Sequence, residues 1–173
     1  DQPWIVAYWH HPAYTHGSHN SDTEGQLVDM RENALPILES YGVDLVLTGH
    51  SHNYERSFLI DGHYGTSDTF GPGHIVDGSS GNPYLKPGGL AAHAGAVYTV
   101  AGTSGSVVSM TLDHPAMYIG LNVLGSLVLD IDGNRLDSRF LDATGVVRDS
   151  FAIVKGSSCP AGPDADQDGV CDG

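Results

Sequence analysis

The sequence predicts a mixed α/β fold, because helical and strand patterns occupy different parts of the chain. Apolar residues three and four positions apart cover residues 24–41 and predict a helix. Short apolar runs at residues 4–9 and 43–47 flank this helix and predict two buried strands. The C-terminal half is rich in alternating apolar and polar residues, and it predicts antiparallel strands over residues 96–101, 107–112, 123–131, 135–140 and 146–154.

Composition excludes several classes of protein. The 173 residues include 7 Lys+Arg and 21 Asp+Glu, for a formal net charge of −14, with 40% hydrophobic and 16% charged residues. This balance is typical of a globular chain and argues against binding to a nucleic-acid backbone. No apolar run approaches the roughly 20 residues of a membrane span, so we expect none. The chain does not start with methionine, and we expect it to begin within a longer protein or after processing.

Local signals refine the first half of the chain. Asp22 precedes the helical pattern and is expected to cap it, and Gly42 is expected to end it. Pro36 lies inside the pattern and should kink or split the helix. The run at residues 4–9 is apolar at every position, which predicts a strand in the middle of a sheet. Asp132 and Gly133 predict a hairpin turn between two of the later strands.

Histidines follow both of the predicted N-terminal strands. His10 ends the first apolar run, and His50 and His52 follow the second. Parallel strands joined by a helix bring their carboxyl ends to one edge of a sheet, which is where α/β proteins bind ligands. Neutral imidazole is a common metal ligand. The pattern therefore predicts a metal site at this edge, and the alternative, loop histidines with ordinary hydrogen bonds, is weakened by the position of His10.

These residues belong to longer motifs. Trp9-His10-x-Pro12-x-Tyr14, His19-Asn20-Ser21-Asp22 and Gly49-His50-Ser51-His52-Asn53-Tyr54-Glu55-Arg56 occur in this order. The sequence, over about residues 4–155, resembles the C-terminal part of a calcineurin-like metallophosphoesterase, and most of all the purple acid phosphatases, with their H-x-P-x-Y and G-H-x-H-x-Y-E-R motifs. The resemblance implies a four-layer α/β/β/α sandwich, of which this chain would be the C-terminal half. It also implies a metal-dependent hydrolase of phosphate monoesters, of the acid phosphatase type.

The resemblance also implies a metal centre of two ions, iron with zinc or manganese. His10 and His50 would ligate the second ion, and His52 would ligate the first. His11 stands where related proteins often have a small residue, and it is left out of this ligand set. Two metal ions also explain how a protein of net charge −14 would attract a phosphoester.

The substrate would meet a second set of residues by the same resemblance. His19 would contact the phosphate and protonate the leaving alkoxide, and His16 is a weaker competitor for this role. Tyr54 and Arg56 are candidate substrate contacts. In the alternative interpretation, Arg56 pairs with an acidic neighbour to hold the loop, and Tyr54 packs beside it. The remaining histidines, among them His63 and His114, are expected to have structural roles.

The remaining metal ligands of the family lie in motifs that precede these ones. No D-x-H, G-D-x-x-D/Y or G-N-H-E/D string occurs here, so the carboxylate that bridges the two ions is expected in an N-terminal half of the same domain. That half is the expected partner, and the 173-residue chain alone is expected to be inactive.

Beyond Lys155 the composition changes, and we expect residues 1–155 to be the catalytic part and 156–173 an acidic linker with a partial calcium repeat. Asp164, Asp166, Asp168 and Asp172 occupy the early positions of a calcium loop, with Gly169 at the turn, and resemble a thrombospondin type 3 repeat. Cys159 and Cys171 bracket the loop, which predicts a disulfide and a secreted protein. The alternative is a solvated acidic terminus.

Three other functions compete with the leading one. The first is a non-catalytic extracellular calcium-dependent binding module with a degenerate phosphatase-like domain. The second is a cytosolic nucleotide phosphodiesterase, which the Tyr54-Glu55-Arg56 extension and the cysteine-bearing tail disfavour. The third is a serine hydrolase, for which Ser104 gives only an out-of-register match.

Overall fold

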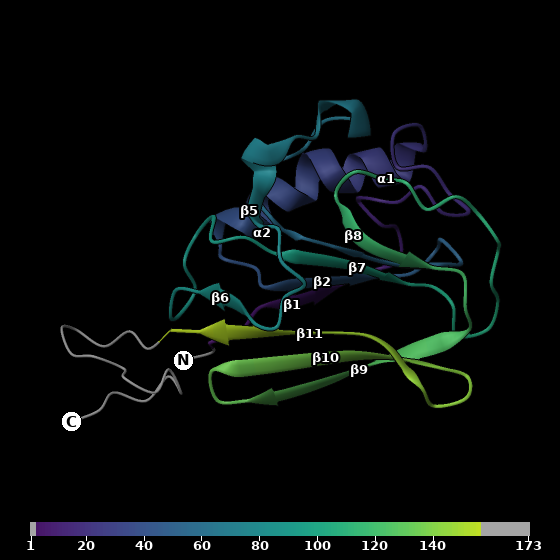
Figure 1. The fold of residues 1–173 in the computed structure, drawn as a ribbon. Helices are drawn as coiled ribbons and strands as arrows, with labels where there is room; N and C mark the ends of the chain where they lie inside the picture. The colour runs from purple at the N-terminus through teal and green to yellow at the C-terminus, as the bar shows by residue number, and fades with distance from the viewer. Residues whose placement is uncertain (1–2, 157–173) are drawn as a thin grey trace, which may run out of the picture.

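The structure, a computed structural model, describes residues 3–156. Helices form one outer layer, a five-stranded mixed sheet forms the middle layer, and a four-stranded sheet forms the other outer layer (Figure 1). The predicted mixed α/β fold is confirmed. The described residues make three layers, so the four-layer sandwich stays a prediction for a longer protein.

The N-terminal unit has the predicted order of strand, helix and strand. β1 (Val6–Tyr8) runs parallel to β2 (Leu45–Thr48). Between them lie α1 (Gly25–Asp29), the π-helical turn η1 (Met30–Ala34) and α2 (Leu35–Ser40). The expected disturbance at Pro36 is confirmed, because a proline has no N–H for the α-helical ladder and the π-helical turn ends just before it.

Two predictions for this unit are wrong. Asp22 does not cap the helix: its carboxylate accepts hydrogen bonds from the N–H and the hydroxyl of Ser67, and Glu24 occupies the N-cap position. β1 lies at the edge of the five-stranded sheet, whose order is β1-β2-β7-β3-β8, and Tyr8 is 82% exposed. Unbroken apolar character predicted a central strand, but one side of β1 has no partner among residues 3–156.

The rest of the chain forms short strands and long connections. In chain order these are β3 (Tyr54–Ser57), β4 (Leu59–Ile60), the 3₁₀ turns η2 (Ser67–Thr69) and η3 (Pro72–His74), β5 (Ile75–Asp77), β6 (Tyr84–Lys86), β7 (Val97–Ala101), β8 (Met117–Leu121), β9 (Gly125–Asp132), β10 (Arg135–Asp142) and β11 (Val147–Lys155). β4 and β5 pair with each other, and the second large sheet has the order β6-β11-β10-β9.

Most of the predicted C-terminal strands are present. β9 and β10 form an antiparallel hairpin whose turn contains Gly133 with a φ of 53°, as predicted. Residues 107–112 are not a strand, which corrects the prediction, and β8 occupies Met117–Leu121 instead. The N–H of Val108 donates to the carbonyl oxygen of His52 over 3.1 Å. Residues 107–112 therefore bond to the loop that carries His52 and do not extend a sheet.

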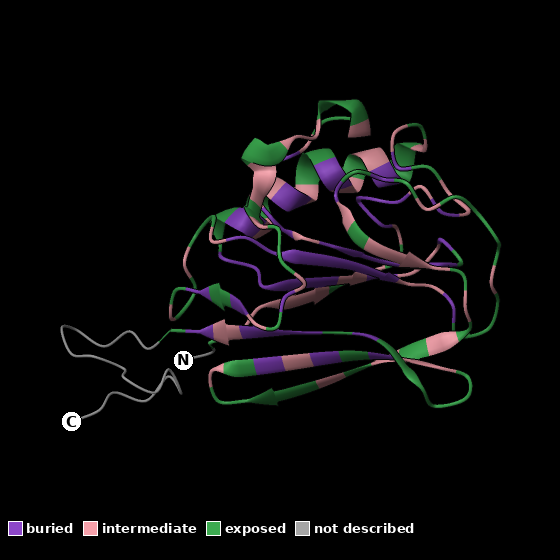
Figure 2. Cartoon of the chain, viewed as in Figure 1, coloured by how far each residue is buried: buried purple, intermediate pink, exposed green. Residues whose placement is uncertain are grey.

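Two apolar cores hold the layers together. One lies between the helices and the five-stranded sheet, and the other lies between the two large sheets and includes Leu45, Tyr84, Leu136 and Phe151. The buried residues follow these two interfaces, while the outer surface of the β9–β10 hairpin is mostly exposed (Figure 2).

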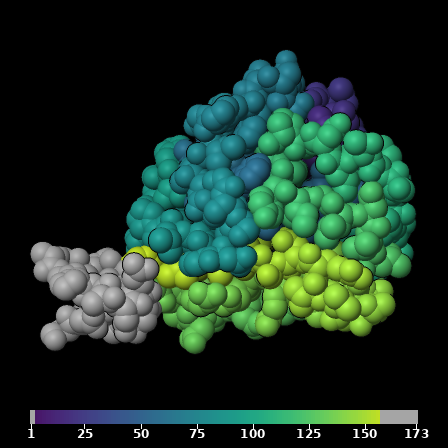
Figure 3. All heavy atoms as spheres, viewed as in Figure 1, coloured from purple at the N-terminus to yellow at the C-terminus, as the bar shows by residue number. Residues whose placement is uncertain are grey.

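The connections gather on one side of the molecule. In the space-filling view, the connections after β4 and before β8 meet on the visible face, over the C-terminal strands (Figure 3). Among residues 3–156, every helix is too short or too polar to cross a bilayer.

Candidate metal centre

The candidate site lies beyond the carboxyl ends of β1 and β2. Tyr8 and Leu47 are aligned in the parallel register of these strands, so His10 and His50 follow at the same edge of the sheet. The N–H of Gly49 donates to the carbonyl oxygen of His10 over 3.1 Å, which extends the pairing past the strands. As a result, Nε2 of His10 lies 3.0 Å from Nδ1 of His50. The structure therefore brings these two predicted metal ligands together.

His50 adopts an unusual backbone conformation. Its φ is 60°, in the left-handed region that non-glycine residues seldom occupy. The chain reverses here, and the N–H of Ser51 bonds to the carbonyl oxygen of Gly49 over 2.6 Å. Such conformations persist where the surroundings enforce them, often at functional sites. The reversal turns the His50 ring toward His10.

A third imidazole lies beside this pair. The ring of His11 is 4.9 Å from the ring of His10 and 4.6 Å from that of His50, measured between centroids. A ligand nitrogen from each of these three histidines lies within 4.8 Å of the others. The sequence prediction left His11 out of the ligand set because of its position in the family motif. Its adjacency to His10 was the signal that pointed to it.

Glu24 connects the predicted catalytic histidine to this centre. Its Oε2 lies 2.8 Å from Nδ1 of His19 and 3.6 Å from Nε2 of His50. The rings of His19 and His50 are themselves 3.7 Å apart between centroids. The sequence did not point to Glu24 as a site residue, because it indicated only that Glu24 begins the predicted helix. Glu24 follows His19 by five positions, and the chain turns between them so that the two side chains meet.

The charges of this cluster affect its acid–base behaviour. Partial burial opposes ionisation of Glu24, but the N–H of Asn20 and the His19 ring outweigh it and hold the pKa of the carboxyl below its usual value. Partial burial lowers the pKa of His50, and so do the neighbouring rings of His19, His11 and His10, against the opposing effect of Glu24. His50 is therefore neutral near pH 7, as a metal-ligating imidazole must be.

Residues of the connection between β2 and β3 fix the loop that carries His19. The carbonyl oxygen of the Asn53 side chain accepts a hydrogen bond from the N–H of Ser18 over 2.7 Å, and Ser51 bonds through its hydroxyl to Thr15. Gly17 lies so close that a Cβ atom there would overlap the side chains of Ser51 and Asn53. Only glycine fits this approach without displacement of the loop.

Glu55 holds the other end of the same loop. Its buried carboxylate accepts a hydrogen bond from the hydroxyl of Thr15, and another from the N–H of His16 over 3.3 Å. Burial raises the pKa of the Glu55 carboxyl, and these two hydrogen bonds oppose the increase. Residues 51 and 53 in the bend before β3, and residue 55 within β3, thus bind the loop together.

His16 lies in a separate group. Its Nδ1 is 3.0 Å from Oδ1 of Asp113, and its Nε2 is 3.4 Å from Oδ2 of Asp22. The ring of His114 packs against it with 4.8 Å between centroids. Burial, and to a smaller extent the nearby His16, lower the pKa of His114 to about 3. His16 therefore contacts carboxylates in this structure, and its role toward a substrate stays a prediction.

His52 does not join the His10–His50 cluster. It is exposed, it belongs to none of the metal-binding groups of residues 3–156, and its backbone N–H donates to Oγ of Ser18 over 2.8 Å. Its place in the family motif assigns it to a different ion from His10 and His50. Its role as a ligand therefore stays a prediction.

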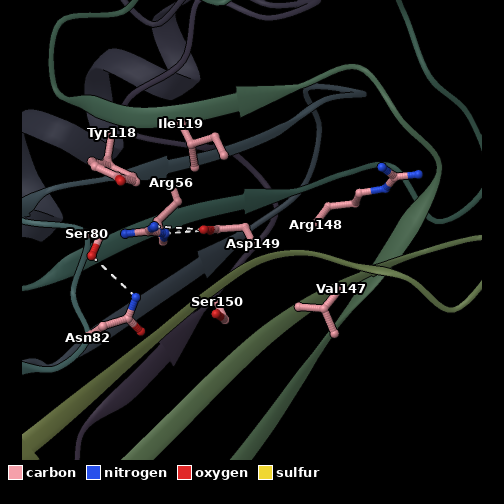
Figure 4. Close-up of a pocket in the computed structure, with 9 residues that line it drawn as sticks. All are labelled: Arg56, Ser80, Asn82, Tyr118, Ile119, Val147, Arg148, Asp149 and Ser150. Atoms are coloured by element: carbon pink, nitrogen blue, oxygen red, sulfur yellow. Dashed lines mark hydrogen bonds and ion pairs between the residues drawn. The ribbon is translucent and has the colours of Figure 1, made fainter.

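Tyr54 and Arg56 are buried between the two large sheets. Nε and Nη2 of Arg56 donate to the two carboxylate oxygens of Asp149 over 2.6 and 2.8 Å, and the Tyr54 hydroxyl donates to the same carboxylate over 2.7 Å. Figure 4 shows the guanidinium facing Asp149 in a pocket that the two sheets line. These contacts agree with the alternative interpretation, in which Arg56 pairs with an acidic neighbour and Tyr54 packs beside it. The prediction that Tyr54 and Arg56 touch substrate gains no support from them.

The donor set at the strand ends fits a metal ion. Three imidazoles converge there, and a carboxylate lies beyond one of them. Nitrogen ligands of this kind suit zinc, iron and other first-row transition metals. The calcium prediction for Asp164, Asp166, Asp168 and Asp172, and the disulfide prediction for Cys159 and Cys171, lie outside the described residues.

Comparison with known proteins agrees with this geometry. Residues 1–54 match the family model of the calcineurin-like phosphoesterases. This segment contains β1, α1, η1, α2, β2 and all the histidines and the glutamate of the cluster, so the similarity covers the candidate site.

Part of the chain is similar in sequence to purple acid phosphatases. Purple acid phosphatase 15 of Arabidopsis thaliana is 41% identical over 81 residues, which is 46% of this chain and 14% of that protein. Purple acid phosphatase 18 of the same plant is 37% identical over 81 residues, 46% of this chain and 17% of that protein. An uncharacterized protein of Mycobacterium tuberculosis is 36% identical over 92 residues, 50% of this chain and 17% of its own length.

A solved structure has the same fold in part. The purple acid phosphatase PPD1 of yellow lupin (Lupinus luteus) seeds superimposes with a TM-score of 0.57 at 18% identity, over 94% of this chain and 28% of that one. At this identity the likeness concerns the fold alone. The chain thus spans less than one third of each of these proteins, and its match to the curated sequences covers about half of it or less.

Proposed function

We propose that this chain contributes part of the active site of a metal-dependent phosphomonoesterase of the acid phosphatase type. The observation that carries the proposal is the 3.0 Å separation of Nε2 of His10 and Nδ1 of His50, inside the segment that matches the phosphoesterases. His10 and His50 would hold one metal ion, and His52 would contribute to a second. Iron with zinc or manganese is the proposed pair.

The bound ions would polarise the phosphate and lower the pKa of a coordinated water. The chain's own residues supply the proton to the leaving group. Oε2 of Glu24 lies against Nδ1 of His19 and orients the ring, which leaves Nε2 as the nitrogen that donates the proton to the leaving alkoxide. Glu55, Asn53 and Gly17 keep this loop in place, so they position His19 without contact to the reacting atoms.

The remaining ligands are proposed to come from the preceding half of the same domain. β1 lies at the sheet edge, and an apolar groove runs along it, lined by Val6, Ala7, Tyr8, Trp9, Met30, Ala34, Ile37 and Leu38. A strand that pairs with β1 would satisfy its free backbone groups and cover Tyr8, which is 82% exposed. This supports the N-terminal half as the occupant of the groove.

Complementation tests the proposal. The upstream half of the gene would be expressed with this chain, fused or in trans, and hydrolysis of an aryl phosphate measured with and without a chelator. We expect metal-dependent activity in the complemented protein, loss of most of it in His50→Ala, and little change in the control His74→Ala. Activity that survives the chelator would contradict the proposal. Folded, complemented protein that binds metal but lacks hydrolysis would favour the non-catalytic module.

The calcium repeat at Asp164–Asp172 and secretion stay proposals that rest on sequence alone. Calcium takes 6–8 oxygen ligands at about 2.3–2.6 Å, which suits alternating aspartates better than zinc or iron does. Calorimetry with calcium on the full chain and on Asp166→Ala would test the repeat. Equal affinity in the two proteins would leave only a solvated acidic terminus.

A further inference from the structure

We infer that His11 is a third imidazole ligand of this centre, so that His10, His11 and His50 hold one late first-row metal ion between them. The inference rests on the proposed function, because it concerns the same ion. It departs from the motif-based ligand set, which contains His10 and His50 only. It also predicts that the described part of the chain binds such an ion without an N-terminal half.

The first argument is the convergence of nitrogen atoms. One ligand nitrogen from each of the three rings lies within 4.8 Å of the other two, and those of His10 and His50 are 3.0 Å apart. Ligands about 2.0–2.1 Å from a common ion are separated by roughly 3–3.5 Å, so only small rotations of the His11 ring are needed. All three rings are mutually edge-on, with interplanar angles of 82°, 72° and 62°.

The second argument is the freedom of the His11 ring. Its backbone is held, because Nε1 of Trp9 donates to the His11 carbonyl oxygen over 2.6 Å and the next residue, Pro12, is buried. No hydrogen bond of the ring itself occurs among residues 3–156, and no carboxylate of those residues pairs with it. A histidine with a fixed backbone and an uncommitted ring, placed against two other imidazoles, has both nitrogens available.

The third argument is the orientation of His50. Its Nε2 faces Oε2 of Glu24 at 3.6 Å, and its Nδ1 faces His10. A carboxylate beyond a histidine favours the proton on the near nitrogen and leaves the far nitrogen free to ligate, which is the usual arrangement at histidine metal sites. The lone pair of His50 Nδ1 then faces Nε2 of His10, and a ligand nitrogen of His11 lies within 4.8 Å of this pair.

The chemistry of this donor set indicates the class of ion. Three neutral nitrogens suit zinc, cobalt, nickel and copper, and they disfavour magnesium and calcium, which take oxygen ligands. The inferred site is therefore specific for a late transition metal. Its nitrogen ligands also differ from the carboxylate oxygens that the aspartates of residues 164–172 would offer.

Cobalt(II) binding to the full 173-residue chain tests the inference, because cobalt ligated by nitrogen has visible absorption that reports its coordination. Calorimetry and absorption spectra would be recorded for the natural sequence and for His11→Ala, His10→Ala, His50→Ala and the exposed control His93→Ala. We expect one cobalt ion bound at the cluster, with affinity at least about tenfold weaker in His11→Ala and a changed spectrum. His93→Ala should bind as the natural sequence does.

The outcomes separate the inference from the proposed function. Loss of affinity in His10→Ala and His50→Ala, with unchanged affinity and spectrum in His11→Ala, would overturn the inference and leave the proposed function standing. Absence of cobalt binding by the natural sequence would overturn the inference and would count against the metal centre. His11→Asn, which keeps a polar side chain of smaller size, provides a second variant if circular dichroism shows that His11→Ala folds poorly. Weakened binding in the folded Asn variant supports the inference, and unchanged binding contradicts it.

Discussion

Nε2 of His10 lies 3.0 Å from Nδ1 of His50, although the two residues are 40 positions apart in the sequence. The parallel pairing of β1 and β2 produces this contact, since each histidine follows its strand at the same sheet edge. The intervening helix makes the parallel connection possible. The position of the candidate metal centre is thus a consequence of strand direction.

Replacement of His19 by Asn in the complemented protein should lower kcat by about 10²–10⁴-fold with little change in KM, because proton donation matters in the transition state. An unchanged kcat with a raised KM would show that His19 binds the substrate only.

Gly17→Ala should lower the free energy of unfolding by about 1–3 kcal/mol, because the new Cβ in the loop that carries His19 would overlap the buried side chains of Ser51 and Asn53. Gly25→Ala is the matched control, since nothing lies within 4 Å of a Cβ at this position in α1. The control should be neutral or more stable by about 0.5–1 kcal/mol, as alanine favours a helix. Urea unfolding of both variants measures the difference, and equal stabilities would contradict the prediction.

Asp149→Asn should destabilise the fold by about 3–5 kcal/mol, because it leaves the buried guanidinium of Arg56 without its anionic partner. Asp137→Asn removes the partner of the exposed Arg135 and should cost only about 0–1 kcal/mol. Urea unfolding of the two variants provides the comparison. A small effect of Asp149→Asn would mean that water or other groups solvate Arg56.

His114 should make the free energy of unfolding depend on pH. Burial and the neighbouring His16 lower the pKa of His114 to about 3 in the folded protein, whereas an unfolded histidine titrates near 6.5. Between these values the unfolded state binds the extra proton. This contribution is therefore complete above about pH 6.5 and is lost progressively as the pH falls toward 3.

Urea unfolding from pH 7 to pH 4 measures this dependence. His114→Gln should reduce the slope by up to about 1.4 kcal/mol per pH unit, whatever its effect on stability at pH 7. Gln26→Ala, at an exposed residue that does not titrate, should keep the natural slope. Equal slopes in all three proteins would show that His114 titrates normally in the fold.

Much of the fold could be predicted from the sequence because its signals are local. The helical stripe, Pro36 and Gly42 determine conformation over a few residues, and the π-helical turn and the φ of 77° at Gly42 agree with them. Alternation likewise predicted the β9–β10 hairpin. Residues 107–112 also alternate between apolar and polar residues, but the N–H of Val108 bonds to His52 instead of to a neighbouring strand. A local pattern carries no information about this contact with a distant residue.

What the sequence by itself determined is the order of elements and the arrival of His10 and His50 at one edge, since a strand-helix-strand unit has a single favoured handedness. Only the tertiary structure decided which other side chains meet there. His11 joins the pair because the chain bends after β1, and Glu24 reaches His19 through a turn in which the Glu24 N–H donates to the carbonyl oxygen of Asn20. Arg56 faces Asp149, 93 residues away, because the two sheets pack face to face. Such contacts depend on the three-dimensional packing of distant segments, which no local pattern specifies.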